Sequence, residues 1–168
     1  MAAPPYIAVV GASQPKGTQE RVAEEVGRGL AAAGAVVVTG GGSGVMAGAC
    51  RGAQSAGGTT IGILPGLDRR AANPWVSLAL PTGLGELRNG LIIRAADAVV
   101  AVGGGYGTLS EIALALRGGL GVVGVDSWPV EGMEVAESAA AAVKRALELA
   151  QAASPPPYRG PAFGAELR

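Results

Sequence analysis

Glycine is concentrated in two short segments, each of which follows an apolar run and precedes a helical pattern. Residues 103–111 have the sequence Gly-Gly-Gly-Tyr-Gly-Thr-Leu-Ser-Glu, and residues 40–44 have the sequence Gly-Gly-Gly-Ser-Gly. Because glycine has no Cβ atom, an anion can approach the main chain closely, and the unpaired amides and the dipole of the following helix favour negative charge. Both segments therefore predict binding of a phosphate group.

Each segment also has a purely structural interpretation. One glycine would satisfy the turn before residue 108, and residues 108–111 match a capping box in which Glu111 reaches back to the amide of Thr108. Four glycines within residues 103–107 exceed that need, which favours a ligand. In the earlier segment glycines also permit close packing of a helix on a strand, and residues 42–47 match the dinucleotide-binding fingerprint only formally, because they follow the second strand.

Further candidate contacts lie in the loops after the first and fourth apolar runs. Gly11 and Ser13 follow the first run, with Lys16 nearby, although an ordinary connecting loop is an equally good interpretation. Arg88 and Asn89 open the helix after the fourth run, and a guanidinium pairs well with phosphate or carboxylate. From the glycine segments, the predicted ligand contacts, with a hydroxyl and an aromatic ring among them, are Gly41, Gly42, Ser43, Gly44, Val45, Met46, Gly104, Gly105, Tyr106, Gly107 and Thr108.

The elements that must position these residues alternate between strand and helix patterns. Apolar runs without polar alternation are typical of strands buried on both faces of a parallel sheet. We therefore expect a three-layer α/β/α protein with a mostly parallel sheet of six to seven strands, in which both glycine segments line one crevice at the carboxyl ends of the strands. The predicted strands cover residues 7–10, 35–38, 59–64, 76–80, 98–102 and 121–125, and the predicted helices cover residues 22–33, 45–56, 86–96, 108–117 and 135–151.

Length and charge limit the classes of function. With 168 residues we expect one phosphate-binding domain over residues 1–151 and a Pro-rich tail over residues 152–168, which is either disordered or a strap onto a partner subunit. Thirteen basic and thirteen acidic side chains cancel, so no long-range field attracts nucleic acid or a membrane. The start of the chain lacks a signal-peptide pattern, which predicts a cytoplasmic protein.

Two residue types narrow the chemistry further. The chain has no histidine, which excludes His-based triads and His metal sites, and no metal site is expected. The single cysteine, Cys50, lies in a helical stretch among alanines and glycine, where a buried small apolar residue is the favoured interpretation.

Residues 88–111, together with residues 39–46, resemble the Lonely-guy family of nucleoside 5'-monophosphate phosphoribohydrolases. That family has the motif P-G-G-x-G-T-x-x-E with an Arg-Lys pair fifteen residues ahead. In this chain Gly103 replaces the proline, and Asn89 replaces the lysine beside Arg88; the motif positions that match are Gly104, Gly105, Gly107, Thr108 and Glu111. Residues 59–66, 73–74, 82–83 and 88–89 resemble more closely the sister group that includes the molybdenum cofactor carrier proteins.

The resemblance implies a Rossmann-like homodimer or higher homo-oligomer that binds a small phosphorylated ligand, with Arg88 and Glu111 at the family's catalytic positions. One implied function is binding of a nucleoside monophosphate or of molybdenum cofactor. The alternative is cleavage of the N-glycosidic bond of a nucleoside monophosphate, without a required cofactor, in which the carboxylate activates water and the arginine holds the phosphate or assists the departing base.

Two further classes of protein are considered: a pyridoxal phosphate enzyme and an interaction domain without a ligand. Pyridoxal phosphate enzymes need a Schiff-base lysine, and the chain offers only Lys16, in a loop, and Lys144, on the polar face of the last helix, so a lysine decarboxylase is excluded. An interaction domain that has no ligand remains an alternative. For such a domain we expect no thermal stabilisation by nucleotides.

Overall fold

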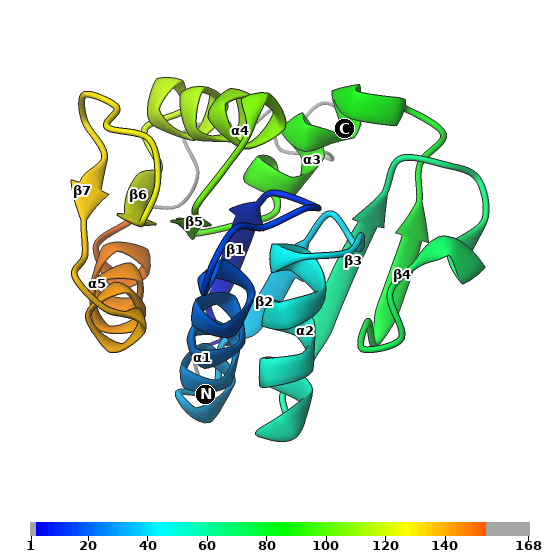
Figure 1. Ribbon diagram of the computed structural model, residues 1–168, viewed down its shortest axis with the longest axis horizontal. Helices are drawn as coiled ribbons and strands as arrows, with labels where there is room; N and C mark the ends of the chain where they lie inside the picture. Colours follow the sequence, from blue (N-terminus) through cyan, green and yellow to red (C-terminus); the bar gives the residue numbers. More distant parts are fainter. Residues whose placement is uncertain (1–2, 154–168) are drawn as a thin grey trace, which may run out of the picture.

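The computed structural model describes residues 3–153, which form a seven-stranded parallel sheet between two layers of helices (Figure 1). The sheet order is β4-β3-β2-β1-β5-β6-β7, and every neighbouring pair is parallel. The chain thus builds outward from β1 in one direction and then returns to place β5 on the other side of β1. The strands are β1 (Tyr6–Gly11), β2 (Val36–Thr39), β3 (Thr60–Leu64), β4 (Leu78–Pro81), β5 (Ala98–Val102), β6 (Gly121–Val125) and β7 (Glu134–Val135).

The helices divide between the two faces of the sheet (Figure 1). Helices α1, α2 and α5 pack on one face, and α3 and α4 pack on the other. In the described residues no helix has the length and apolar character needed to cross a bilayer. The helices are α1 (Gln19–Ala32), α2 (Val45–Ser55), α3 (Asn89–Arg94), α4 (Tyr106–Arg117) and α5 (Ala139–Ala152), with short 3-10 turns η1 (Arg69–Ala71) and η2 (Gly85–Arg88).

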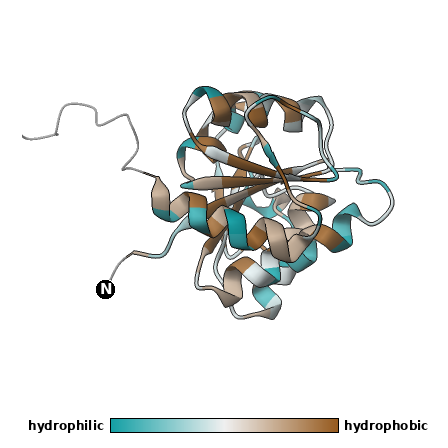
Figure 2. Ribbon diagram, turned by 90° about the vertical axis from the view of Figure 1, so that its left-hand side faces the viewer, coloured by the Kyte–Doolittle hydropathy of each residue, from teal (hydrophilic) through white to brown (hydrophobic). Residues whose placement is uncertain are grey.

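The central strands bury side chains on both faces, as the apolar runs predict. In β1, Ile7 and Val9 join the cluster beneath α1, α2 and α5, whereas Ala8 and Val10 join the cluster beneath α3 and α4. Seen along the sheet in Figure 2, the strands are apolar and lie between the two helix layers. These features confirm a Rossmann-like α/β fold.

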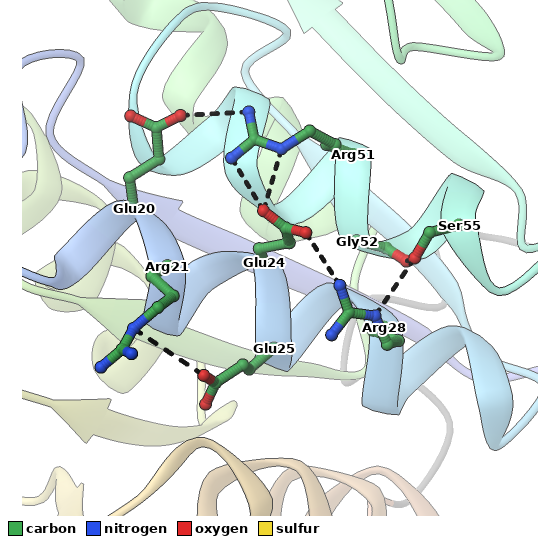
Figure 3. Close-up of polar contacts among 8 residues, drawn as sticks. All are labelled: Glu20, Arg21, Glu24, Glu25, Arg28, Arg51, Gly52 and Ser55. Carbon is green, nitrogen blue, oxygen red and sulfur yellow. Dashed lines mark hydrogen bonds and ion pairs between the residues drawn. The ribbon is translucent and has the colours of Figure 1, made fainter.

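Helices α1 and α2 pack unusually closely. A Cβ atom on Gly52 of α2 would lie 1.9 Å from the carbonyl oxygen of Glu24 in α1, so only glycine fits there. Along the same seam Arg51 pairs with Glu24 at 2.9 Å and with Glu20 at 3.2 Å, while Glu24 also pairs with Arg28 (Figure 3). The close approach holds the first α-β-α unit together below the candidate site.

Four local predictions require correction or qualification. The helix predicted over residues 86–96 is divided into η2 and α3, and the helix predicted from residue 135 begins at Ala139, because Val135 pairs with β6 at the sheet edge and Ser138 caps α5 by accepting from the Ala141 amide. The capping box predicted over residues 108–111 is wrong, because α4 already begins at Tyr106; Thr108 is instead the N3 residue, and its hydroxyl accepts from the Gly105 N–H at 3.4 Å. Of the predicted tail, residues 154–168 lie outside the described range.

Cys50 is buried, with its sulfur 3.5 Å from the Thr39 hydroxyl, and burial raises the pKa of its thiol. The prediction of a buried cysteine is therefore confirmed.

Candidate functional site

A polar cavity of about 440 Å³ opens beyond the carboxyl ends of β1 and β5. At this point the strand order reverses, so the loops leaving the two strands diverge and a crevice opens between them. The cavity brings together nine of the predicted site residues: Gly11, Ser13, Met46, Arg88, Asn89, Gly105, Gly107, Thr108 and Glu111. They come from four separate parts of the chain that only the topology makes neighbours.

The loop after β5 turns the main chain toward this cavity. Gly103 and Gly104 have φ angles of 57° and 148°, which glycine adopts without steric cost. Helix α4 follows, and its first internal hydrogen bond runs from the Leu109 N–H to the Gly105 carbonyl at 2.9 Å. The N–H groups of residues 106–108 precede that bond, and together with the helix dipole they favour negative charge at this end of α4.

Arg88 lines the same cavity and makes two hydrogen bonds of its own, one of which continues through Asn89 and Ser110 to α4. Its Nε donates to the Ile63 carbonyl at 2.8 Å, and its Nη1 donates to the Asn89 side-chain oxygen. Asn89 in turn donates to the Ser110 hydroxyl at 3.2 Å, and that hydroxyl donates to the Gly107 carbonyl at 2.7 Å. The arginine is thereby fixed relative to both β3 and α4.

Glu111 lies one turn after Gly107 on α4, with its side chain directed into the same cavity. Only 8% of Glu111 is exposed, and this burial raises the pKa of its carboxyl group to about 7, although the positive charge of Arg88 lowers it. Among the described residues Glu111 and Arg88 form no ion pair within 4.0 Å. The carboxyl group can therefore exchange a proton near neutral pH, next to a cation that is not bound to it.

The glycine segment after β2 contributes only Met46 to the cavity lining. Main-chain groups of this segment instead form hydrogen bonds with neighbouring loops. The Val45 N–H donates to the Ala12 carbonyl at 3.1 Å, and the Gly41 carbonyl accepts from the Asn73 N–H at 2.9 Å. Close packing accounts for its glycines. The predicted residues of this segment that lie outside the lining are Gly41, Gly42, Ser43, Gly44 and Val45.

Two predicted residues of the later glycine segment face away from the polar cavity. A Cβ atom on Gly104 would lie 2.9 Å from the indole nitrogen of Trp128. The Tyr106 ring stacks on Trp128 with ring centres 6.3 Å apart, and it lines an adjoining apolar hollow. Lys16 lies outside the polar cavity as well.

Four lining residues were not predicted: Ala12, Gln14, Pro65 and Glu86. Pro65 directly follows β3 and Gln14 follows β1, so the rule that ligands gather beyond the carboxyl ends of parallel strands could have indicated both. Glu86 precedes Arg88 by two residues in η2. In the regular helix that the sequence predicts, residues two positions apart point to different sides, so that helix gave no reason to expect both side chains at one cavity.

Comparison with known proteins gives a consistent picture. The model of the SLOG cluster4 family (LDcluster4) matches residues 4–156. A protein of Archaeoglobus fulgidus is 40% identical over 138 residues, which cover 82% of this chain and 91% of the relative.

Among solved structures, the molybdenum cofactor binding protein of Rippkaea orientalis superimposes with a TM-score of 0.81 at 33% identity, over 90% of this chain and 98% of that one. The molybdenum cofactor carrier protein of Chlamydomonas reinhardtii gives a TM-score of 0.80 at 35% identity, over 88% of this chain and 98% of that one. This chain thus shares its fold with both proteins, and the similarity extends over nearly their whole length. The family match covers most of the sequence, and the chain belongs to the SLOG cluster4 family.

Proposed function

We propose that this protein binds a phosphorylated nucleotide or nucleotide-like cofactor and holds it intact. The observation that carries the proposal is that one cavity is lined both by the N-terminal residues of α4 and by Arg88. Main-chain N–H groups and a guanidinium are the two protein groups best suited to phosphate oxygens. The phosphate of the ligand would lie between them.

The fit of the cavity to such a ligand rests on its lining. Gly105 and Gly107 present no side chain, and a Cβ atom at either position would meet no heavy atom within 4 Å, so a ligand can lie directly against the main chain. The similar structures from Rippkaea and Chlamydomonas are molybdenum cofactor binding and carrier proteins. We therefore propose a phosphorylated pterin such as molybdenum cofactor as one candidate cargo, beside nucleoside monophosphates.

Asn89 supports holding over catalysis. The resembling hydrolases have a lysine at this position, whereas Asn89 is neutral and 8% exposed, and its side chain is engaged by Arg88 and Ser110. Among the described residues that line the cavity, Arg88 is then the one cationic side chain, beside the carboxyl groups of Glu86 and Glu111. One fixed cation is enough to hold a phosphate.

A second candidate function is hydrolysis of the N-glycosidic bond of a nucleoside monophosphate. The buried carboxyl group of Glu111, with its pKa near 7, favours it, because a general base works best when its pKa is close to the working pH. In this reaction water would add to the ribose C1' while the bond to the base breaks, giving free base and ribose 5-phosphate. Glu111 would accept the proton of that water, and the departing base would take up a proton as it leaves, so that water is divided between the ribose and the base.

One experiment separates the two functions. The protein is incubated with a panel of nucleoside monophosphates, bound species are detected by native mass spectrometry, and free base and ribose 5-phosphate are measured. Binding with every nucleotide intact supports the carrier. Turnover that disappears in Glu111→Gln supports the hydrolase. Neither binding nor turnover for any nucleotide contradicts the hydrolase and a nucleotide as the cargo of the carrier.

A further inference from the structure

A second hollow, of about 660 Å³ and largely apolar, lies between α3 and α4 beside the polar cavity. Glu86, Asn89 and Gly107 line both spaces, so the two lie next to each other. The remaining residues that line the hollow are Leu87, Gly90, Tyr106, Ser110, Ala113, Leu114 and Arg117. Its walls are therefore apolar, and its edges carry charged and hydroxyl groups.

The floor of this hollow carries glycines that the fold does not require. Gly90 in α3 and Gly107 in α4 have helical backbone angles, and a Cβ atom on either would meet no heavy atom within 4 Å. By contrast, Gly27 and Gly52 in α1 and α2 are needed, because a Cβ atom there would collide with the main chain of the neighbouring helix. Glycine destabilises a helix interior relative to alanine, so Gly90 and Gly107 indicate the close approach of something outside the chain.

An aromatic ring stands at the edge of the same hollow. Tyr106 is 86% exposed, and its stacking on Trp128, which lies outside the lining, supports the ring. Leu87 and Leu114 are likewise exposed, at 82% and 42%. An exposed but supported aromatic ring beside aliphatic side chains is suited to contact with a flat ring system.

We propose that this hollow, the ring subsite, receives the planar heteroaromatic ring of the ligand whose phosphate lies at the N-terminus of α4. The inference rests on the proposed function, because the phosphate would fix one end of the ligand and the neighbouring hollow, which shares three lining residues with the polar cavity, lies within reach of the other end. The Glu86 carboxylate can accept hydrogen bonds from ring N–H groups, such as the 2-amino-4-oxo-pyrimidine edge that guanine and pterins share. The ring subsite therefore favours a purine or pterin over a phosphorylated sugar alone.

The test compares a ligand that has the ring with one that lacks it. Guanosine 5'-monophosphate and ribose 5-phosphate are titrated into the protein by calorimetry, and we expect the nucleotide to bind at least ten-fold more tightly, in line with the contribution of one stacked base. Gly90→Leu places a side chain inside the ring subsite without touching the polar cavity. It should bring nucleotide affinity down to that of ribose 5-phosphate and leave the affinity for ribose 5-phosphate unchanged.

Gly66→Leu is the matched control. A Cβ atom on Gly66 also meets nothing within 4 Å, its φ lies outside the left-handed region, and it lines neither space. Equal affinities of wild-type protein for the two ligands, or unchanged nucleotide affinity in folded Gly90→Leu, would overturn the ring subsite. So would a dimer that Gly90→Leu dissociates while both affinities persist, because a second copy would then cover the hollow. Failure of ribose 5-phosphate to bind would count against the proposed phosphate site itself.

Discussion

Arg88 keeps part of its guanidinium free because its fixed contacts use few of its hydrogens. A guanidinium has five N–H donors, and the Ile63 carbonyl and the Asn89 oxygen engage one each. The planar group is also desolvated, and this burial lowers the pKa of Arg88, while the nearby carboxylates of Glu111 and Glu86 raise it. An arginine in this state remains a cation and can offer its other donors to a ligand.

Replacement of Arg88 by lysine tests this geometry. An ammonium group cannot reach the Ile63 carbonyl, the Asn89 oxygen and a phosphate at once, so Arg88→Lys should weaken binding of ribose 5-phosphate about ten-fold, a typical cost of a charge-assisted hydrogen bond. Calorimetric titration measures the change. Arg94→Lys, an exposed arginine of α3, is the control, and equal affinities of the two variants would contradict the role of Arg88.

The carboxyl group of Glu111 predicts a pH dependence of stability. Its pKa is about 7 in the folded protein and 4.5 in the unfolded chain, so between these values the folded state binds the extra proton. Stability is therefore greatest below pH 4.5 for this group and is lost as the pH rises through 7. From pH 5 to pH 8 the loss should be about 2 to 3 kcal/mol.

Urea unfolding at both pH values measures this contribution when wild-type protein is compared with Glu111→Gln. Relative to Glu111→Gln, the free energy of unfolding of the wild-type protein should be lower at pH 8 than at pH 5 by that amount. A difference that is the same at both pH values would show that Glu111 titrates as an ordinary exposed carboxyl group.

The helices show how the same residue type serves opposite purposes. Gly52 lies where α1 and α2 touch, and its missing side chain permits the contact. Gly90 lies in α3 with open space above it, so its missing side chain serves nothing within the chain. Sequence alone cannot separate the two cases, because both are helical glycines among apolar neighbours.

Alanine at the two positions should change stability in opposite directions. Gly52→Ala forces a methyl group against the Glu24 carbonyl and should destabilise the protein by about 1 to 3 kcal/mol. Gly90→Ala gains helix propensity and should stabilise it by up to about 1 kcal/mol. Urea unfolding of both variants checks the signs, and destabilisation by Gly90→Ala would mean that the space above it is filled within the chain.

At the level of the elements, the sequence predicts the central strands well because burial on both faces leaves an unbroken apolar pattern. It predicts the edges poorly. Val135 lies in a two-residue strand whose pairing with β6 no local pattern reveals, and the division between η2 and α3 at Arg88 depends on contacts with β3 and α4. Those same contacts direct Arg88 into the cavity.

At the level of the whole molecule, topology determines the site. The reversal of strand order at β1 and β5 brings Gly11, Arg88 and Glu111 to one cavity although long stretches of chain separate them. The sequence predicts that loops at the carboxyl ends of the strands share one edge. It does not predict that the Gly41 and Gly42 carbonyls accept hydrogen bonds from Asn73 in a neighbouring loop, because that depends on how the loops pack.

The apolar side chains of the edge strand β4 bear on assembly. Leu78 and Leu80 are 54% and 51% exposed at one edge of the sheet, where an uncovered strand invites pairing with another chain. We expect a homodimer or larger homo-oligomer, and Leu80→Glu should shift it toward monomer. Light scattering after size-exclusion chromatography measures the mass, and a monomeric wild-type protein would contradict this expectation.

The most direct test of the account is a crystal structure of the protein with a bound nucleoside monophosphate. The account predicts that phosphate oxygens lie within hydrogen-bond distance of the amides at the start of α4 and of the Arg88 guanidinium. A phosphate bound instead at residues 40–44, or at any place that the amides of residues 106–108 do not reach, would contradict it.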